Sequence, residues 1–126
     1  DGNGKFLPEA LNQLKVVGKW LKINGESIYG TRARDGELWH EGDGIRFTRS
    51  KDNKTVYAFC KVWPGEKLVL KSLSAGRGSK ISLLGVGKRL RWKNRKAGLE
   101  IYLTEGIRAE RDEKTLMAYV FRIHMS

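Results

Sequence analysis

One stretch of this sequence contains the change from helix to strand on which the fold depends: Gly18-Lys19-Trp20-Leu21-Lys22-Ile23-Asn24-Gly25-Glu26-Ser27-Ile28-Tyr29-Gly30-Thr31-Arg32. Its first half continues a pattern of apolar residues at helical spacing, and its second half begins a strand. Asn24 and Gly25 lie between the two halves. Both residue types tolerate the left-handed backbone conformation that ends many helices, so the sequence predicts a left-handed stop at these positions.

Residues 8–23 are predicted to form the helix, and Pro8 suits its first position because the missing N–H needs no partner there. The residues of one apolar face are Ala10, Leu11, Leu14, Val17, Gly18 and Leu21. Val16, Trp20 and Ile23 form a second apolar stripe, roughly opposite the first. We therefore expect both sides of the helix to be covered, one by the β-domain that follows and the other by a part of the protein absent from these residues.

After Gly25 the apolar period changes from 3.6 to 2, which is typical of strands. The predicted strands are residues 28–32, 44–49, 55–63, 66–71, 80–84, 88–93, 98–104 and 116–123. Several short strands of this kind, separated by turn residues, indicate a sandwich. The predicted fold is mainly β: an antiparallel β-sandwich of about eight strands, preceded by one N-terminal α-helix.

The predicted strand at residues 55–63 is apolar on both faces. Tyr57, Phe59 and Trp63 alternate with smaller apolar residues, and the last predicted strand shows the same property. A strand that is apolar on both faces needs cover on both faces. The sequence thus predicts a larger structure packed against the sandwich.

Length and composition describe one globular domain. The chain has 126 residues, of which 40% are hydrophobic and 31% charged. No apolar stretch approaches the roughly 20 residues of a membrane-spanning helix, and no signal peptide is visible. Cys60 is the single cysteine, which excludes an internal disulfide and favours a small buried residue. Because the sequence begins at Asp1 rather than Met, we expect a processed, truncated or excised piece.

The formal net charge of +11 raises the question of an anionic partner. The strongest candidate is the basic run Lys88–Lys96, in which Trp92 interrupts the cations. Leu90 and Trp92 share one strand face and Arg91 and Lys93 the other, so we expect a buried tryptophan beneath a solvated cationic face. Contact with an anionic glycan or a membrane surface, and nucleic-acid binding, are the alternatives.

Catalytic and metal-binding patterns are missing from the sequence. His40 and His124 are the two histidines, and neither has a second ligand at metal spacing. The carboxylates cluster in two predicted loops, at residues 37–43 and 105–113. We therefore predict no catalytic residue, no metal site and no cofactor in this chain.

Trp39 is the candidate for a sugar contact, because it lies in the predicted loop at residues 36–40 and loops carry many binding residues. Pyranose rings pack their C–H faces on flat aromatic rings. The alternative is that Trp39 packs against a neighbouring domain or a strand end.

The segment Trp20–Arg32 also resembles the passage that joins the catalytic barrel to the C-terminal domain in α-L-fucosidases of glycoside hydrolase family 29. Further similar segments follow in the same order over most of the chain. They are Asp1–Gly4, Leu7–Glu9, Ile45–Thr48, Thr55–Ala58, Trp63–Gly65, Leu90–Lys93 and Leu99–Leu103.

This resemblance implies a division of the chain into residues 1–25, the loop and last helix of a (β/α)8-type barrel whose remainder is absent, and residues 26–126, the C-terminal β-sandwich. It implies a parent enzyme that hydrolyses terminal α-L-fucosides with retention through a covalent fucosyl-Asp intermediate, without a cofactor. The catalytic Asp and Glu of that family lie upstream of Asp1, so the chain alone is expected to be inactive. A secreted, periplasmic or lysosomal parent is also implied.

The expected role of the chain is then to stabilise the barrel of the same polypeptide, with fucosylated glycans as partners only through the parent enzyme. The candidate barrel-docking residues are Trp20, Tyr57, Phe59 and Trp63. Two other functions remain as alternatives: a freestanding carbohydrate-binding module, and, with less support, a basic nucleic-acid-binding β-domain. The two apolar stripes of the helix argue against both, because an independent module has no need for them.

Overall fold

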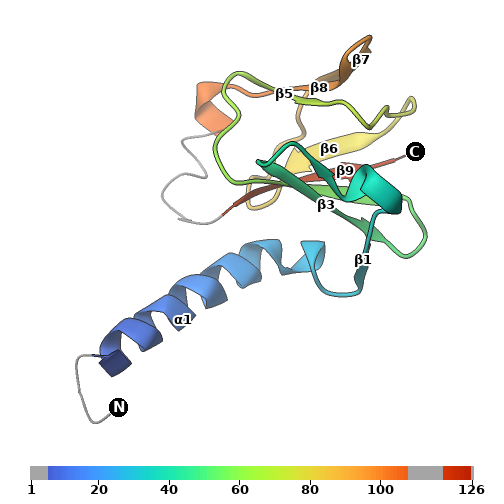
Figure 1. Ribbon diagram of the computed structural model, residues 1–126. Coiled ribbons are helices and arrows are strands. Elements are labelled where there is room, and N and C mark those ends of the chain that lie inside the picture. The colour runs from blue at the N-terminus through green and yellow to red at the C-terminus, as the bar shows by residue number, and fades with distance from the viewer. Residues whose placement is uncertain (1–5, 108–117, 126) are drawn as a thin grey trace.

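The computed structural model describes residues 6–107 and 118–125, with side chains from residue 15 onward. Figure 1 shows one long helix beside two layers of strands. Helix α1 (Phe6–Asn24) continues into the short 3-10 helix η1 (Gly25–Ser27), and nine strands in two antiparallel sheets follow within the described part of the chain. The predicted class, a mainly β sandwich with one N-terminal helix, is confirmed.

The larger sheet, sheet A, has six strands in the order β1-β3-β4-β9-β6, with β2 also pairing with β3. Their bounds are β1 (Thr31–Ala33), β2 (His40–Glu41), β3 (Ile45–Ser50), β4 (Thr55–Cys60), β6 (Lys80–Leu83) and β9 (Tyr119–His124). A second 3-10 helix, η2 (Gly36–Trp39), precedes β2. The smaller sheet B has the order β5-β8-β7, with β5 (Lys67–Leu70), β7 (Trp92–Arg95) and β8 (Gly98–Tyr102).

The hydrophobic core lies between the two sheets. Ala58 of β4 pairs with Phe121 of β9, and both are fully buried, as are Leu99 and Ile101 on the facing side of β8. Alternate residues of a strand point to opposite sides of its sheet. The neighbours of Ala58 in β4, Tyr57 and Phe59, are therefore directed to the outer face of sheet A, where α1 lies.

Most predicted elements occur, with shifted ends. Helix α1 begins two residues before Pro8, so that Pro8 is its third residue. Residues 28–30 form a turn at Gly30, whose φ is 69°, and the strand predicted from residue 28 starts at Thr31. The two-residue strand β2 was not predicted, because it is too short to show any period. Residues 116 and 117, the start of the last predicted strand, lie outside the described residues.

The strand predicted at residues 88–93 begins only at Trp92. Its first part instead approaches β6 of sheet A, where Ser82 bridges to Arg89 and the Leu90 N–H donates to the Ile81 carbonyl at 2.8 Å. The chain then passes to sheet B. A segment that crosses between two sheets keeps its side-chain alternation, so its sequence resembles one continuous strand.

The left-handed stop predicted at Asn24 and Gly25 is wrong. Asn24 has φ −113° and ψ 0°, and the chain continues into η1. Side chains satisfy the end of the helix instead: Asn24 Nδ2 donates to the Trp20 carbonyl at 3.0 Å, and Ser27 Oγ donates to the Asn24 carbonyl at 2.5 Å. These hydrogen bonds replace those that a left-handed cap would make.

Candidate functional site

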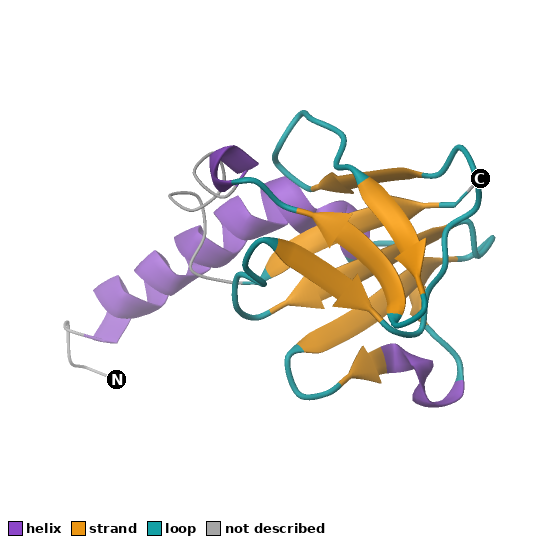
Figure 2. Ribbon diagram, turned by 90° about the horizontal axis from the view of Figure 1, so that it is seen from above, coloured by secondary structure: helices purple, strands orange, loops and turns teal. Residues whose placement is uncertain are grey.

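The junction between α1 and sheet A is the part of the molecule that the predicted docking residues share. Both ribbon views place the C-terminal end of α1 against this sheet, on the side away from sheet B (Figures 1 and 2). We call the apolar side chains at this junction the outer cluster. Its buried members are Trp20, Tyr57, Leu84 and Val120, and Leu21, Ile23 and Phe59 pack against them.

Trp20 attaches the helix to the sheet. Its side chain is 5% exposed, and its ring centroid lies 6.4 Å from that of Phe59. The indole Nε1–H donates to the carbonyl of Ala118, just before β9, at 2.9 Å. A buried tryptophan needs a partner for this N–H, and the hydrogen bond supplies it.

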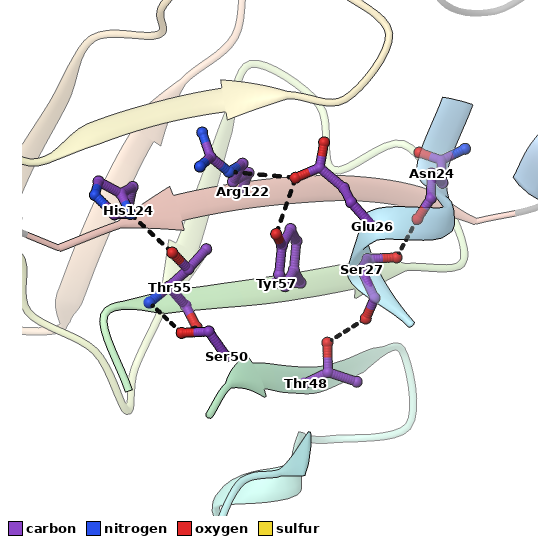
Figure 3. Close-up of polar contacts among 9 residues, drawn as sticks. All are labelled: Asn24, Glu26, Ser27, Thr48, Ser50, Thr55, Tyr57, Arg122 and His124. Atoms are coloured by element: carbon purple, nitrogen blue, oxygen red, sulfur yellow. Dashed lines mark hydrogen bonds and ion pairs between the residues drawn. The ribbon is translucent and has the colours of Figure 1, made fainter. Parts of the chain in front are cut away.

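Polar contacts hold η1 on the same face (Figure 3). The Tyr57 hydroxyl donates to the Glu26 carboxylate at 2.9 Å, and Arg122 Nε lies 3.4 Å from the same oxygen. Thr48 Oγ1 donates to the Ser27 carbonyl at 2.6 Å. Burial raises the pKa of Tyr57, and its hydrogen bond to Glu26 raises it further. The helix end is thereby bonded to β3, β4 and β9.

Trp63 lies elsewhere. It follows β4 on the core side, with its ring centroid 5.0 Å from that of Tyr119 and 6.4 Å from that of Phe121. It packs against the core between the sheets. The structure thus brings Trp20, Tyr57 and Phe59 together and leaves Trp63 apart from them.

Trp20 and Tyr57 are already buried within this chain, in the outer cluster, and their side chains are 5% and 6% exposed. They join the helix to the sandwich, while their contact with a second domain stays a prediction. The apolar side chains that remain exposed near the junction are Val17 at 40%, Ile28 at 45% and Tyr29 at 66%. We call these three the junction patch. Ile28 and Tyr29 were missed as candidates because they were assigned to a strand, whereas the turn at Gly30 leaves them in solvent.

Trp39 ends η2 on the surface, where it is 41% exposed. Its ring centroid lies 4.0 Å from that of His40, and the Arg46 guanidinium carbon lies 5.1 Å from it. These two side chains occupy part of the surface of the ring. Its sugar contact stays a prediction.

Several of the described carboxylates and both histidines have hydrogen-bond or ion-pair partners. Glu41 accepts hydrogen bonds from the backbone N–H groups of Lys71 and Ser72 at 2.8 and 3.0 Å, joining sheet A to the segment after β5. At the end of β9, His124 Nδ1 and Thr55 Oγ1 form a hydrogen bond of 2.7 Å. Among the described residues, no three metal-ligating side chains cluster, and no helix is long and apolar enough to span a membrane.

Cys60 is buried in the core, as predicted, with 3% exposure. Burial raises the pKa of its thiol to about 12, and the nearby Glu41 charge contributes to the rise. A thiol in this state is protonated at neutral pH and is a poor nucleophile. Cys60 is thus a core residue.

Comparison with known proteins gives the family. Residues 41–124 match the family described as alpha-L-fucosidase C-terminal domain. Tissue alpha-L-fucosidase of Mus musculus is 35% identical over 91 residues, which cover 71% of this chain and 20% of that protein, and the Bos taurus enzyme is 31% identical over 103 residues, 76% of this chain and 20% of that protein. This chain therefore spans about a fifth of the length of these relatives.

The solved structures agree. The Thermotoga maritima alpha-fucosidase in complex with a mechanism-based inhibitor superposes with a TM-score of 0.65 at 27% identity, over 85% of this chain and 24% of that one. The same enzyme in complex with fucose superposes with a TM-score of 0.63 at 30% identity, over 84% of this chain and 24% of that one. The sequence and the fold point to the same relatives, and the chain belongs to the family of α-L-fucosidase C-terminal domains.

Proposed function

We propose that this chain is the non-catalytic C-terminal portion of a larger α-L-fucosidase and that it stabilises the catalytic domain of that polypeptide. In this proposal residues 1–25 belong to the last helix of a catalytic barrel and residues 26–126 form the sandwich. The parent enzyme hydrolyses terminal α-L-fucosides with retention. Its catalytic pair lies outside this chain.

One observation carries the proposal: among the described side chains of α1, those near its C-terminal end are covered by sheet A, whereas an apolar side chain one turn earlier is exposed. Trp20 is buried against sheet A, whereas Val17 is 40% exposed on the same helix. Ile28 and Tyr29 extend the exposed apolar surface just beyond the helix. Exposed apolar groups that adjoin one another mark interaction sites. A second domain packed against α1 and the turn that follows η1 would cover the junction patch.

The carboxylates of this chain support a non-catalytic role. Retaining hydrolysis needs two carboxyl groups about 5–5.5 Å apart on either side of the glycosidic bond. Glu26 is bound to Tyr57 and Arg122, and Glu41 to the backbone of Lys71 and Ser72. Carboxylates engaged in this way hold structure. We expect the purified chain to show no turnover of an aryl α-L-fucoside.

The test uses the whole parent polypeptide. Replacing two residues of the junction patch, Val17→Ser with Tyr29→Ser, should lower its melting temperature and its yield of active enzyme. The matched control is Leu38→Ser with Val62→Ser, which removes two apolar side chains exposed by 45% and 76% away from α1. The control should leave both measures near wild type.

Two results would overturn the proposal. One is fucoside turnover by the 126-residue chain alone at a rate matching a complete enzyme. The other is an equal loss of stability in the junction and control variants of the parent.

A carbohydrate-binding module is the second candidate, because Trp39 is an indole 41% exposed at the end of η2. It predicts that the chain binds fucosylated glycans and that Trp39→Ala abolishes the binding. Equal binding by the variant and the wild type would remove this candidate.

A further inference from the structure

The positive charge of this protein is concentrated in one part of the chain. Residues 67–99 contain ten Lys and Arg residues and no Asp or Glu, while the whole sequence has a formal net charge of +11. This segment forms β5, β6 and β7 and the connections between them. The excess charge therefore lies mostly on and around sheet B.

The basic segment before and along β7 points its apolar residues inward. Leu90 is 6% exposed, and Trp92 packs against the core with its Nε1–H donating to the Ser79 carbonyl at 3.3 Å. Asn94 bonds to the backbone of Ala75 through both side-chain atoms, at 2.9 and 2.7 Å. Trp92 faces the core, as predicted, but its side chain is half-buried and not fully buried.

The alternate residues are all cationic and all exposed. We call them the cationic row: Arg89, Arg91, Lys93 and Arg95. Arg91, Lys93 and Arg95 are two residues apart, about 6.6 Å in a strand, so these three extend over about 13 Å, and Arg89 precedes them beside β6. Such a line of cations fits a linear polyanion better than a single small anion.

The row has little internal neutralisation. Glu100 is the single carboxylate on the strands of sheet B, and its side chain is 14% exposed. It accepts a hydrogen bond from Tyr102 at 3.0 Å and pairs with Lys67 at 3.7 Å and Arg95 at 4.0 Å. In the described part of the chain, no carboxylate lies within ion-pair distance of Arg89, Arg91 or Lys93.

A shallow pocket adjoins the beginning of the row. It has a volume of about 180 Å³, and its lining includes Arg89, Arg91, Tyr102 and Thr104. Guanidinium groups bind sulfate and carboxylate oxygens, and hydroxyl groups exchange hydrogen bonds with sugar hydroxyls. The pocket thus combines the two kinds of group that an acidic sugar requires.

We propose that the cationic row and its pocket bind an acidic polysaccharide, a sugar chain that bears sulfate or carboxylate groups. Lys93 and Arg95 lie on β7 of sheet B, which is on the far side of the sandwich from α1 (Figure 1), and Arg89 lies beside β6 at the edge of sheet A. Sheet B lies away from α1, so the inference goes beyond the proposed function and does not depend on it.

Other partners fit this face less well. A membrane-binding surface inserts apolar side chains at the interface. Among the side chains that the structure describes, the large exposed apolar ones belong to the junction patch, η2 and Val62, and none of these lies on sheet B. Single-stranded nucleic acid needs exposed rings for base stacking, and Trp92 faces the core. The cations could instead protect β7, an edge strand, from unwanted pairing with another strand. A single charge is enough for that purpose, whereas β7 and the residues just before it carry four.

The test measures binding of the 126-residue chain to heparin, which carries sulfate and carboxylate groups, and to hyaluronan, which carries carboxylates only. Neutral dextran, phosphatidylserine-containing vesicles and a DNA duplex serve as the other probes. The key variant is the triple Arg91→Gln, Lys93→Gln, Arg95→Gln. The matched control, Lys51→Gln, Lys54→Gln, Lys61→Gln, lies on the loops of sheet A and lowers the net charge equally, from +11 to +8.

We expect heparin binding that weakens steeply with salt and no binding to dextran. The key triple should lose affinity about tenfold or more, because each lost pairing forgoes counterion release from the polyanion, and the control should lose less than about threefold. Hyaluronan binding would extend the ligand class to carboxylates, and its absence would assign the row to sulfate. The single variant Lys93→Gln repeats the test without placing a second carboxylate opposite Glu100, the cross-strand partner of Lys93.

The proposal fails if heparin does not bind, or if both triples lose affinity equally, which would show general attraction to a basic protein. It also fails if vesicles or DNA bind more tightly than heparin at the same salt concentration. Near-UV circular dichroism of each variant verifies that it is folded.

Discussion

The outer faces of the two sheets have opposite chemistry. Sheet A turns Tyr57, Phe59 and Val120 outward, and α1 covers them so that Val120 is fully buried. Sheet B turns Arg91, Lys93 and Arg95 outward and leaves them exposed. The outer face of sheet A is thus buried like a second hydrophobic core, whereas the outer face of sheet B is exposed to solvent. A substitution should therefore cost much more stability on sheet A than on sheet B.

The largest effect should come from removing the helix anchor. Trp20→Ala deletes a side chain that is 5% exposed together with its hydrogen bond to Ala118, and we expect a loss of about 3–5 kcal/mol of unfolding free energy. Urea denaturation measures it. Trp39→Ala, at a site 41% exposed, is the control and should cost less than about 1 kcal/mol. Equal costs would mean that α1 does not depend on Trp20 for its place on the sheet.

Alkaline pH should lower the unfolding free energy because of Cys60, which lies on the core side of β4. The unfolded Cys60 thiol loses its proton near pH 8.5, whereas the folded thiol has its pKa raised to about 12. The unfolded state therefore binds fewer protons between these values, and stability falls as pH rises through this window. We expect a decrease of about 1.5 kcal/mol from pH 8.5 to pH 10 from this group.

Cys60→Ala is the comparison for that prediction. The variant has no thiol to titrate, so its unfolding free energy should change less over the same pH range, whatever its starting stability. Parallel pH profiles for the two proteins would contradict the buried-thiol explanation.

A matched pair of tyrosines compares the two outer faces directly. Tyr57 donates to Glu26 beneath α1 at 2.9 Å, and Tyr102 donates to Glu100 on the open face at 3.0 Å. We expect Tyr57→Phe to cost about 1 kcal/mol and Tyr102→Phe about 0.5 kcal/mol or less, because water can replace the partner of the more exposed group. Chemical denaturation of both variants gives the two values. A reversed order would show that the open face is the better ordered one.

The smallest effects should come from exposed ion pairs. Arg122 lies 3.4 Å from Glu26 on sheet A, and Arg95 lies 4.0 Å from Glu100 on sheet B. Exposed pairs contribute little, so we expect Arg122→Gln to cost about 0.5 kcal/mol and Arg95→Gln a value near zero. Melting curves at low and high salt should show that only the Arg122 contribution decreases with salt. A salt-independent loss for Arg122→Gln would indicate lost packing in place of lost charge.

Much of this fold could be predicted from the sequence, because alternation along strands and helical spacing depend on neighbouring residues. The strand at Thr55–Cys60 and the burial of its alternate residues followed from that pattern. The left-handed stop at Asn24 did not occur, since the side chains of Asn24 and Ser27 satisfy the helix end. Local residue preference could not reveal these contacts.

The site was harder to predict than the fold. Two apolar stripes on the helix indicated cover on both sides, and Trp20 does pack on the sandwich. The bond between Glu26 and Tyr57 joins residues 31 positions apart in the sequence, and no local pattern indicates it. Trp63 was grouped with Tyr57 by alternation, but β4 ends at Cys60, and the chain after it no longer follows the strand.

The position of β9 has a consequence for biosynthesis. Its residues, Tyr119–His124, form ladders with both β4 and β6, and Val120 completes the outer cluster. A nascent chain that has not yet reached residue 119 therefore exposes unpaired edges of two strands and an uncovered Trp20. Closure of sheet A must wait until β9 has left the ribosome, and contacts of such long sequence separation form slowly. Translational pausing or cleavage before β9 should therefore yield an aggregation-prone species that chaperones must hold.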